Sequence, residues 1–311
     1  MPHAFGRTAF DPSRPRLDLG PRLSIEAIVN APAAADWLSR VKAWGMLAND
    51  SLGDCVIAEG LHEIEARTTY ASTPFVATTA EAIATYSAVT GYNPADPSTD
   101  QGTNMADFMA YWRKTGVAGH KIVAYASVDI KSFTEIEAAV ALFGAVACGI
   151  SFPKSAMAQF DAGQTWDVVP NDGGIEGGHA IHLGAYDSKT GLYEVVTWGA
   201  VQKVTRKFLA KYLEEAWVVI TQDWIEANGS SPAGLDLYGL GQDFAALTGQ
   251  PNPIVPPVTP PVPPAFPGVL VSAVQAAAAD PQVVTWLKRA HIGIAAEVVT
   301  RLKAILAAPL K

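Results

Sequence analysis

The feature that most constrains this chain is a polar loop that leads directly into a long apolar run. Residues 49–54 read Asn-Asp-Ser-Leu-Gly-Asp, and the apolar run begins with Cys55. Its apolar residues recur at helical spacing, so the pattern predicts a buried helix. Asp54 is a favoured N-cap residue and Gly53 permits a tight approach, so we expect the helix to begin at Cys55.

A cysteine at the start of a helix has chemical consequences. The positive end of the helix dipole favours the thiolate, which is the nucleophilic form of the side chain. Asn49 lies six residues earlier, and its amide would donate to an oxyanion if the loop returned beside the thiol. A buried cysteine on its own is most often a small core residue, so the functional interpretation needs a second motif.

The second motif lies far downstream. Residues 176–187 read Glu-Gly-Gly-His-Ala-Ile-His-Leu-Gly-Ala-Tyr-Asp, which predicts a strand with His179 near its start. A turn at 188–191 and a second strand at 192–197 follow, and then Trp198 and Gly199. His182 is at an odd offset from His179, so we expect it on the other face of the strand.

Taken together, these motifs resemble papain-like cysteine peptidases, particularly the bacterial or phage-type branch. The family has the same order of a cysteine at a helix start, a histidine on a strand and a Trp-Gly pair in the next strand. The resemblance covers roughly residues 35–220, because further segments between and before these motifs also resemble the family. These segments are Ala35-Asp36-Trp37, which resembles the mature start of the family, Gly102-Thr103 with 114–117, and 144–150, which resembles the strand that walls the substrate cleft.

The resemblance implies an α+β, papain-like two-lobed fold, with a helical lobe and an antiparallel β lobe. It also implies acyl transfer, in which the Cys55 thiolate attacks a peptide carbonyl and His179 takes and returns the proton as the imidazolium of an ion pair. The backbone N–H of Cys55 and the side chain of Asn49 would hold the oxyanion. Trp198 would cover the histidine and exclude water.

Two positions depart from the family pattern. The family has Gln as the oxyanion amide, and Asn49 is one methylene shorter. The family also has Asn two residues before the Trp, and here that residue is Val196, which cannot accept a hydrogen bond from a histidine ring. Counting outward from the hairpin turn instead puts Thr197 opposite His179, so we assign Thr197 the orienting role.

The residues expected to line the substrate site are mostly small and carry no charged side chain. Gly53 and Trp198 would border it, and Gly149 and Ala180 match the positions that line the main side-chain pocket of the family. Both are small, which predicts a roomy pocket unless Phe152 refills it. We expect no cofactor and no metal, since the two cysteines lie far apart and no carboxylate–histidine cluster stands out.

Composition limits the possible partners. The net charge is −8 and the basic residues are scattered, which argues against a nucleic-acid surface. No apolar run has the length of a membrane span, so no membrane partner is expected. The first 20 residues lack the apolar core of a signal peptide, so we expect a cytoplasmic protein or part of a phage particle. The N-terminal segment is also too short for the long helical propeptide of many secreted relatives.

Local patterns outline the remaining elements. The first half is rich in predicted helices and the second half in predicted strands, as in an α+β chain with a cleft between two lobes. Thr79 and Thr134 are the candidate caps of two of the helices. The expected helices are 79–90, 105–114 and 132–143, the expected strands are 120–128 and 145–152, and 153–176 is a variable connection.

Composition divides the chain into four parts. Residues 1–34 read as an extended arm and 35–250 as the papain-like domain. Residues 251–267 hold nine prolines and predict a semi-rigid polyproline II linker. Residues 268–311 carry an apolar stripe at helical spacing that so small a piece cannot bury alone. We therefore expect a C-terminal helical segment that binds a protein partner or self-associates.

Two functions fit these observations. The first is a cysteine peptidase or related amidase that acts on a peptide or protein substrate and is tethered by its C-terminal helices. The second is a catalytically degenerate papain-like scaffold, a structural or binding component of an assembly such as a phage particle.

Overall fold

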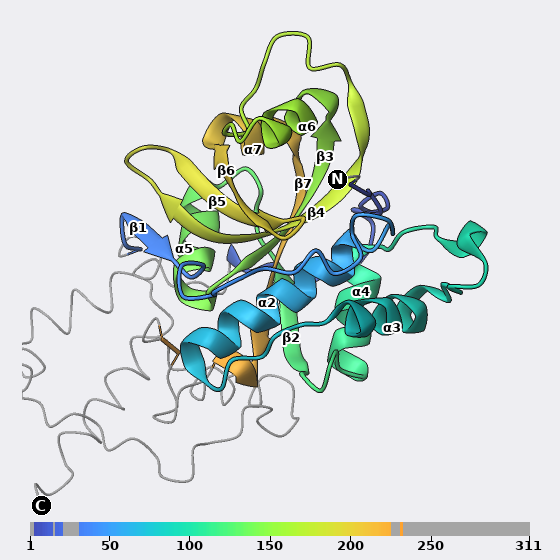
Figure 1. Cartoon of the computed structure of the whole chain (residues 1–311). Helices are drawn as coiled ribbons and strands as arrows, with labels where there is room; N and C mark the ends of the chain where they lie inside the picture. Colours follow the sequence, from blue (N-terminus) through green and yellow to red (C-terminus); the bar gives the residue numbers. More distant parts are fainter. Residues whose placement is uncertain (1–2, 15, 21–30, 225–230, 233–311) are drawn as a thin grey trace, which may run out of the picture. The chain divides into compact units, whose positions relative to one another are not determined.

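The computed structural model describes residues 3–14, 16–20, 31–224 and 231–232 (Figure 1). The predicted linker at 251–267 and the helical segment at 268–311 lie outside the described residues. The described part contains six α-helices and an antiparallel sheet, which confirms the α+β class. The helices are α2 (Cys55–Ala71), α3 (Thr79–Thr90), α4 (Met105–Lys114), α5 (Phe133–Phe143), α6 (Lys154–Asp161) and α7 (Arg206–Tyr212).

Seven strands form one antiparallel sheet in the order β2-β7-β3-β4-β5-β6, and β1 pairs with β4 off this path. The long strand β4 is central, because it pairs with β1, β3 and β5. The strands are β1 (Ala34–Asp36), β2 (Ile122–Ser127), β3 (Val146–Pro153), β4 (Ile175–Asp187), β5 (Leu192–Thr197), β6 (Ala200–Thr205) and β7 (Leu213–Thr221).

Two hydrophobic cores correspond to the two predicted lobes. One core joins α2, α3 and α4, and includes Leu61, Tyr86 and Trp112. The other lies between the sheet and α5 and α7, and includes Val140 and Phe208. Helix α2 packs against β4, so the boundary between the lobes follows this helix and strand. In Figure 1, the start of the chain lies beside the N-terminal end of α2.

Helix α2 is buried along most of its length, from Cys55 to Thr68. It begins at Cys55 as predicted, and Asp54 is its N-cap residue. The Asp54 side chain makes no capping hydrogen bond, however, because its carboxyl is turned into the protein interior. The N-terminus of α2 is therefore not neutralised by the side chain that the sequence suggested.

The predicted helices at 79–90 and 105–114 are confirmed, but two caps were wrong. Helix α3 is capped by Thr78, which forms a reciprocal capping box with Glu81, and not by Thr79. Helix α5 is capped by Ser132, whose side chain accepts from the Glu135 backbone, and not by Thr134. The connection at 153–176 also contains α6, which the sequence pattern did not predict.

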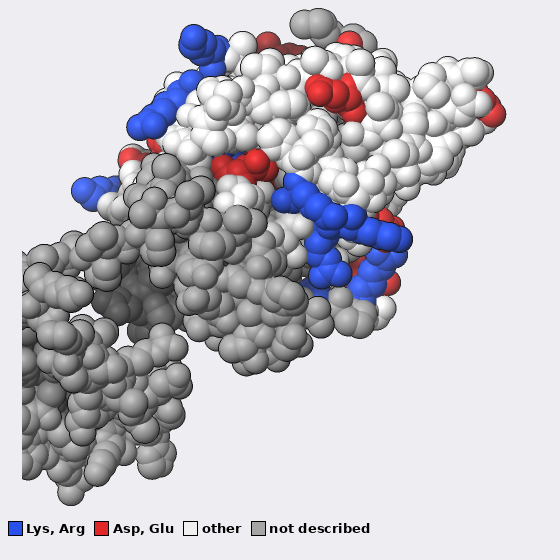
Figure 2. All heavy atoms as spheres, turned by 90° about the horizontal axis from the view of Figure 1, so that it is seen from below, with Lys and Arg blue, Asp and Glu red and all other residues white. Residues whose placement is uncertain are grey.

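Charge is sparse on the face seen from below in Figure 2. Figure 2 shows one large group of basic side chains and further basic side chains apart from it at the upper left edge, with acidic side chains scattered and most of the visible surface uncharged. Among the described residues, no helix combines the length and apolar character that a membrane crossing requires. The described residues also hold no group of three or more His, Cys, Asp or Glu placed to bind a metal ion.

Candidate active site

Cys55 is the first residue of α2, and only 1% of its surface is exposed. Backbone groups of Ala180, Gly6 and Arg7 form hydrogen bonds with the thiol that lower its pKa, but burial outweighs them and raises the pKa to about 11. The thiol is therefore protonated at neutral pH in this state. Both cysteines are free and buried, and Cys148 has a raised pKa because burial in β3 disfavours its thiolate.

His179 lies on β4 and is also 1% exposed. Its Nε2 is 2.7 Å from Thr197 Oγ1, and its ring stacks on Trp198 with centroids 4.4 Å apart. Within the described part of the chain, its buried Nδ1 has no hydrogen-bond partner. Burial, with smaller contributions from the positive charges of His3 and Arg7, lowers the pKa of His179 to about 3. The imidazole is therefore neutral in this state.

These pKa shifts differ from the ion pair that the family resemblance implied. The described state pairs a neutral thiol with a neutral imidazole, because burial opposes the charged form of each group. The helix dipole does favour a thiolate at Cys55, but desolvation is the larger effect here.

Thr197 reaches His179 by a different register from the one that the sequence count gave. His182 pairs with Val196 across β4 and β5, and the register shifts between Leu183 and Ala185. Thr197 is therefore not directly opposite His179, and its hydroxyl reaches the ring diagonally. Val196 packs in a separate buried cluster with Leu38 and Ala185.

Asn49 lies on the loop before α2, as expected, and its amide faces the N-terminal arm. Its Nδ2 donates to the carbonyl oxygen of Leu52 at 3.0 Å and to that of Ala4 at 3.3 Å. The Gly53 backbone N–H donates to the carboxylate of Asp100 at 3.0 Å. The loop thus presents a side-chain amide to a peptide carbonyl beside the start of α2.

The N-terminal arm lies directly over this loop and over β4. We call the residues that bind its backbone the arm site, which consists of Asn49, Gly53, Thr103 and Gly178. Four backbone hydrogen bonds join residues 4–8 of the arm to residues of both lobes. They run from Ala4 N to Asn49 O (2.9 Å), from Thr103 N to Gly6 O (2.7 Å), from Thr8 N to Thr103 O (3.0 Å) and from Arg7 N to Gly178 O (3.1 Å).

Side chains of the arm complete the burial of the two reactive groups. His3 stacks on Trp198 with centroids 4.5 Å apart, and Phe5 meets the His179 ring edge-on at 5.7 Å. Gly6 fits against Gly53 so closely that a Cβ on Gly6 would lie 1.8 Å from the Gly53 carbonyl oxygen. The arm therefore shields Cys55 and His179 from solvent.

The predicted substrate positions Gly149 and Ala180 pair directly across β3 and β4. The space beside Gly149 is occupied, since a Cβ there would lie 2.7 Å from Arg7 Cδ and 2.6 Å from Glu215 Cγ. Phe152 does not occupy that space; it packs edge-on against His179 and Trp198. The pocket predicted to be roomy thus holds an arginine from the arm.

Sequence reasoning missed the arm residues Phe5, Gly6 and Arg7, and also Glu215 at the start of β7. The arm was assigned only an extended conformation, which carries no information about where it docks. The adjacent pair Glu214-Glu215 was a weak signal, because charged residues are rare at the start of a strand in a buried sheet.

Comparison of the sequence with protein-family models and with curated proteins finds no match. The structure is similar to xylellain, a cysteine protease from Xylella fastidiosa, with a TM-score of 0.57 and 14% identity over 70% of this chain and 96% of that chain. It is also similar to procathepsin B S9 from Trypanosoma congolense, with a TM-score of 0.50 and 9% identity over 70% of this chain and 86% of that chain. The chain therefore has the papain-like fold that the sequence predicted.

Proposed function

We propose that this chain is a papain-like cysteine peptidase of the bacterial or phage type that hydrolyses peptide bonds with Cys55 and His179. One observation carries the proposal. Cys55 begins α2 against Ala180, the residue after His179, and Thr197 holds Nε2 of the histidine while Nδ1 has no partner among the described residues. A nucleophile beside a base that a third group orients is the signature of covalent acyl transfer.

In the proposed reaction, His179 Nδ1 takes the proton of the Cys55 thiol, and the sulfur attacks the substrate carbonyl. His179 then returns the proton to the leaving amine, and water hydrolyses the thioester. The proton on Nε2 donates to Thr197 Oγ1, which keeps Nδ1 free to act as the base. Trp198 covers the ring and limits its rotation.

The oxyanion would be held by the Cys55 backbone N–H and the Asn49 side chain. The contact from Asn49 to the Ala4 carbonyl supports this role, because the shorter amide already reaches a peptide carbonyl at the start of α2. Such donors act on the transition state and lower the barrier more than they strengthen substrate binding.

Catalysis requires the arm to leave the arm site. Burial is the largest cause of both pKa shifts, and the arm supplies part of that burial. Once the arm is displaced, water lowers the pKa of the thiol and raises that of the imidazole, which favours the thiolate–imidazolium pair.

Mass spectrometry of peptide digests tests the proposal. The full chain and a Gly6→Ala variant, which releases the arm, are incubated with a mixture of unstructured peptides. We expect cleavage products from the variant, none after Cys55→Ala or His179→Ala is added to it, and retained cleavage with Cys148→Ala. Absence of cleavage by a folded variant whose Cys55 is accessible to iodoacetamide would refute the peptidase and leave an inactive scaffold.

A further inference from the structure

A series of hydrogen bonds connects two parts of the arm site through side chains that the proposed mechanism does not use. Asp100 is at its centre. Its carboxylate accepts the Gly53 backbone N–H, with Oδ2 at 3.0 Å and Oδ1 at 3.2 Å, and Oδ1 also accepts the Tyr86 hydroxyl. The Tyr86 oxygen in turn accepts the Gly102 backbone N–H at 2.9 Å. One carboxylate and one phenol therefore join the loop before α2 to the segment that carries Thr103.

The Gly53 end of this series leads to Asn49 through a single peptide group. The N–H of Gly53 and the carbonyl of Leu52 belong to the same planar unit, and in a trans peptide they point in opposite directions. Asp100 accepts from the N–H, and the Leu52 carbonyl oxygen accepts from Asn49 Nδ2 at 3.0 Å. Asp100 therefore fixes the peptide plane whose oxygen holds the Asn49 amide.

We call this series the Asp100 network, which runs from Gly102 through Tyr86, Asp100 and the peptide between Leu52 and Gly53 to Asn49. Its Gly102 end leads to the backbone of the arm, because Thr103 follows directly. The Thr103 backbone N–H donates to the Gly6 carbonyl oxygen at 2.7 Å, and its carbonyl oxygen accepts from Thr8 N at 3.0 Å. A peptide bound to Thr103 therefore lies one residue away from the Tyr86 end of the network.

The surroundings of the Asp100 network restrict its motion. Tyr86 is fully buried in the core of the helical lobe, and its ring centroid lies 5.1 Å from that of Tyr92. Burial and the hydrogen bond to Asp100 raise the pKa of the Tyr86 hydroxyl, so at neutral pH it is protonated and donates to the carboxylate. A Cβ on Gly53 would lie 2.9 Å from Asp100 Oδ1, which leaves the loop little room to shift toward the carboxylate.

We propose that Asp100 and Tyr86 are positioning residues for the proposed oxyanion site, which hold the Asn49 amide in place and couple it to the binding of peptide backbone at Thr103. The proposal rests on the proposed peptidase function for its effect on catalysis, but not for the coupling itself. Both side chains act through the backbone groups that they bind. Binding energy gained away from the scissile bond is thereby used to orient a donor that acts on the transition state.

Amide-resolved hydrogen exchange on the full chain tests the coupling. Tyr86→Phe removes the acceptor of the Gly102 amide and one of the donors that orient Asp100. We therefore expect exchange to accelerate about 2- to 10-fold at the Gly102 amide and also at the Gly53 amide, which does not contact the lost hydroxyl. Tyr92→Phe is the matched control, because it removes a hydroxyl that forms no hydrogen bond among the described residues from the neighbouring ring. It should leave both amides at the wild-type rate.

Steady-state kinetics in the Gly6→Ala background, which releases the arm, test the positioning. Asp100→Asn should lower kcat about 10- to 100-fold with little change in KM, because a displaced donor weakens transition-state stabilisation rather than peptide binding. Tyr86→Phe should lower kcat by only about 2- to 10-fold, because Gly53 keeps its acceptor. When Asn49→Ala is also present, Asp100→Asn should cause no further loss, because the group that it positions is gone.

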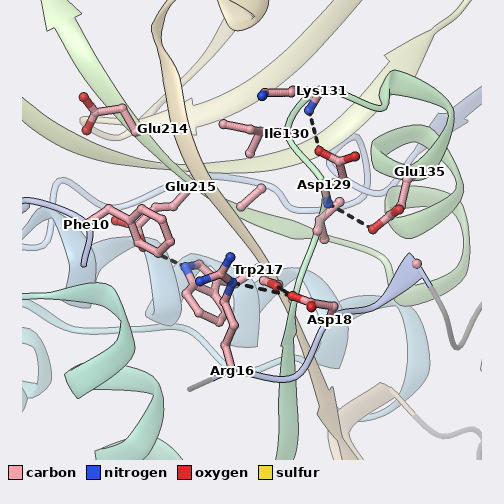
Figure 3. A pocket seen from close by; sticks show the side chains of 14 residues that line it. Phe10, Arg16, Asp18, Asp129, Ile130, Lys131, Glu135, Glu214, Glu215 and Trp217 are labelled. Atoms are coloured by element: carbon pink, nitrogen blue, oxygen red, sulfur yellow. Dashed lines mark hydrogen bonds and ion pairs between the residues drawn. The ribbon is translucent and has the colours of Figure 1, made fainter. Parts of the chain in front are cut away.

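Asp129→Asn is the matched control for Asp100→Asn. Asp129 Oδ1 likewise accepts a backbone N–H, that of Lys131, at 3.0 Å. Figure 3 shows this contact at the wall of a cavity of about 590 Å³, which also includes Phe10 and Trp217 and no residue of the Asp100 network. The control should leave both kcat and KM unchanged.

The outcomes separate the Asp100 network from the peptidase itself. Cleavage at a kcat that Asp100→Asn does not change overturns the positioning role and leaves the peptidase in place. A loss from Asp100→Asn that persists in full beside Asn49→Ala also overturns that role, because Asp100 then acts on another group. Accelerated exchange at Gly53 in Tyr86→Phe, without cleavage by any folded variant, supports the coupling and overturns the peptidase. Unchanged exchange at Gly53 in folded Tyr86→Phe protein overturns the coupling whatever the activity.

Discussion

Replacing Gly6 with alanine tests whether the arm controls access to Cys55. The Cβ that this substitution adds would lie 1.8 Å from the Gly53 carbonyl oxygen and 2.2 Å from its carbon. Ordinary contacts are near 3.5 Å, so the backbone must retreat by about 1.5 Å or more. Residue 6 cannot move away from Gly53 without disturbing another contact, because the Gly6 carbonyl oxygen accepts a hydrogen bond from the Thr103 backbone N–H at 2.7 Å.

The energetic effect follows from the bonds that this retreat breaks. The two hydrogen bonds nearest Gly6 are those from Thr103 N to Gly6 O and from Arg7 N to Gly178 O. Each is worth about 0.5–1.5 kcal/mol net, so the docked arm loses about 1–3 kcal/mol. The population with an exposed Cys55 should rise by about 5- to 150-fold.

The assay is the rate of alkylation by iodoacetamide at pH 8, with the modified residue located by peptide mass spectrometry. Cys148 is an internal control, because it is fully buried in β3 and should stay unmodified in both proteins. Gly45→Ala is the matched variant, since the atom nearest its Cβ would be a flexible Leu47 methyl at 3.0 Å. It should label Cys55 at the wild-type rate.

Two results would contradict this reasoning. If folded Gly6→Ala protein labels Cys55 at the wild-type rate, the arm does not shield the thiol. If Cys55 and Cys148 accelerate together, the substitution loosens the whole domain, and the exposure of Cys55 does not come from release of the arm.

Four further outcomes are expected. In the Gly6→Ala background, Thr197→Val should lower kcat by about 10- to 100-fold and Thr197→Ser should restore it, as steady-state kinetics with a peptide substrate would show. In the same assay, Asn49→Ala should lower kcat by about 10²–10³ with little change in KM, and an unchanged kcat would remove it from the oxyanion site. Wild-type alkylation of Cys55 should keep rising with pH toward its pKa of about 11, whereas Gly6→Ala should reach its plateau at a lower pH. For the proposed association segment 268–311, Ile294→Asp with Val298→Asp should abolish any self-association in sedimentation velocity and leave the thermal unfolding of the first domain unchanged.

The parts of the fold that sequence predicted well depend on local patterns. The start of α2 at Cys55 followed from apolar spacing and a capping residue, and the β4–β5 hairpin followed from alternation around a turn. The geometry of the contact between Thr197 and His179 was harder to predict from sequence, because the register of β4 and β5 shifts between Leu183 and Ala185. One extra residue in a strand changes which side chains face each other, and no turn count contains that information.

The docking of the arm was beyond sequence reasoning for a different reason. Arg7 binds Glu215, which lies 208 residues away along the chain, and Gly6 fits against Gly53 only because both lack a Cβ. Contacts of such separation leave no periodicity, and a segment rich in proline and arginine reads the same whether it is docked or free. Burial is the largest cause of the raised pKa of Cys55. The helix-dipole argument predicted a thiolate because it did not include this burial.

The arm binds the same groups that the proposed substrate would bind, so the arm and the substrate compete for one site. The Asn49 amide, the Thr103 backbone and the Glu215 carboxylate all bind the arm, so a change that weakens substrate binding there also weakens the arm. A tethered segment competes at an effective concentration on the order of millimolar, whereas a free peptide competes at its own concentration. A substrate that merely copied residues 4–8 would therefore displace the arm poorly. Efficient turnover requires either substrate contacts beyond those of the arm or a step that removes the arm. Gly6→Ala weakens docking of the arm, so a substrate needs fewer additional contacts to displace it.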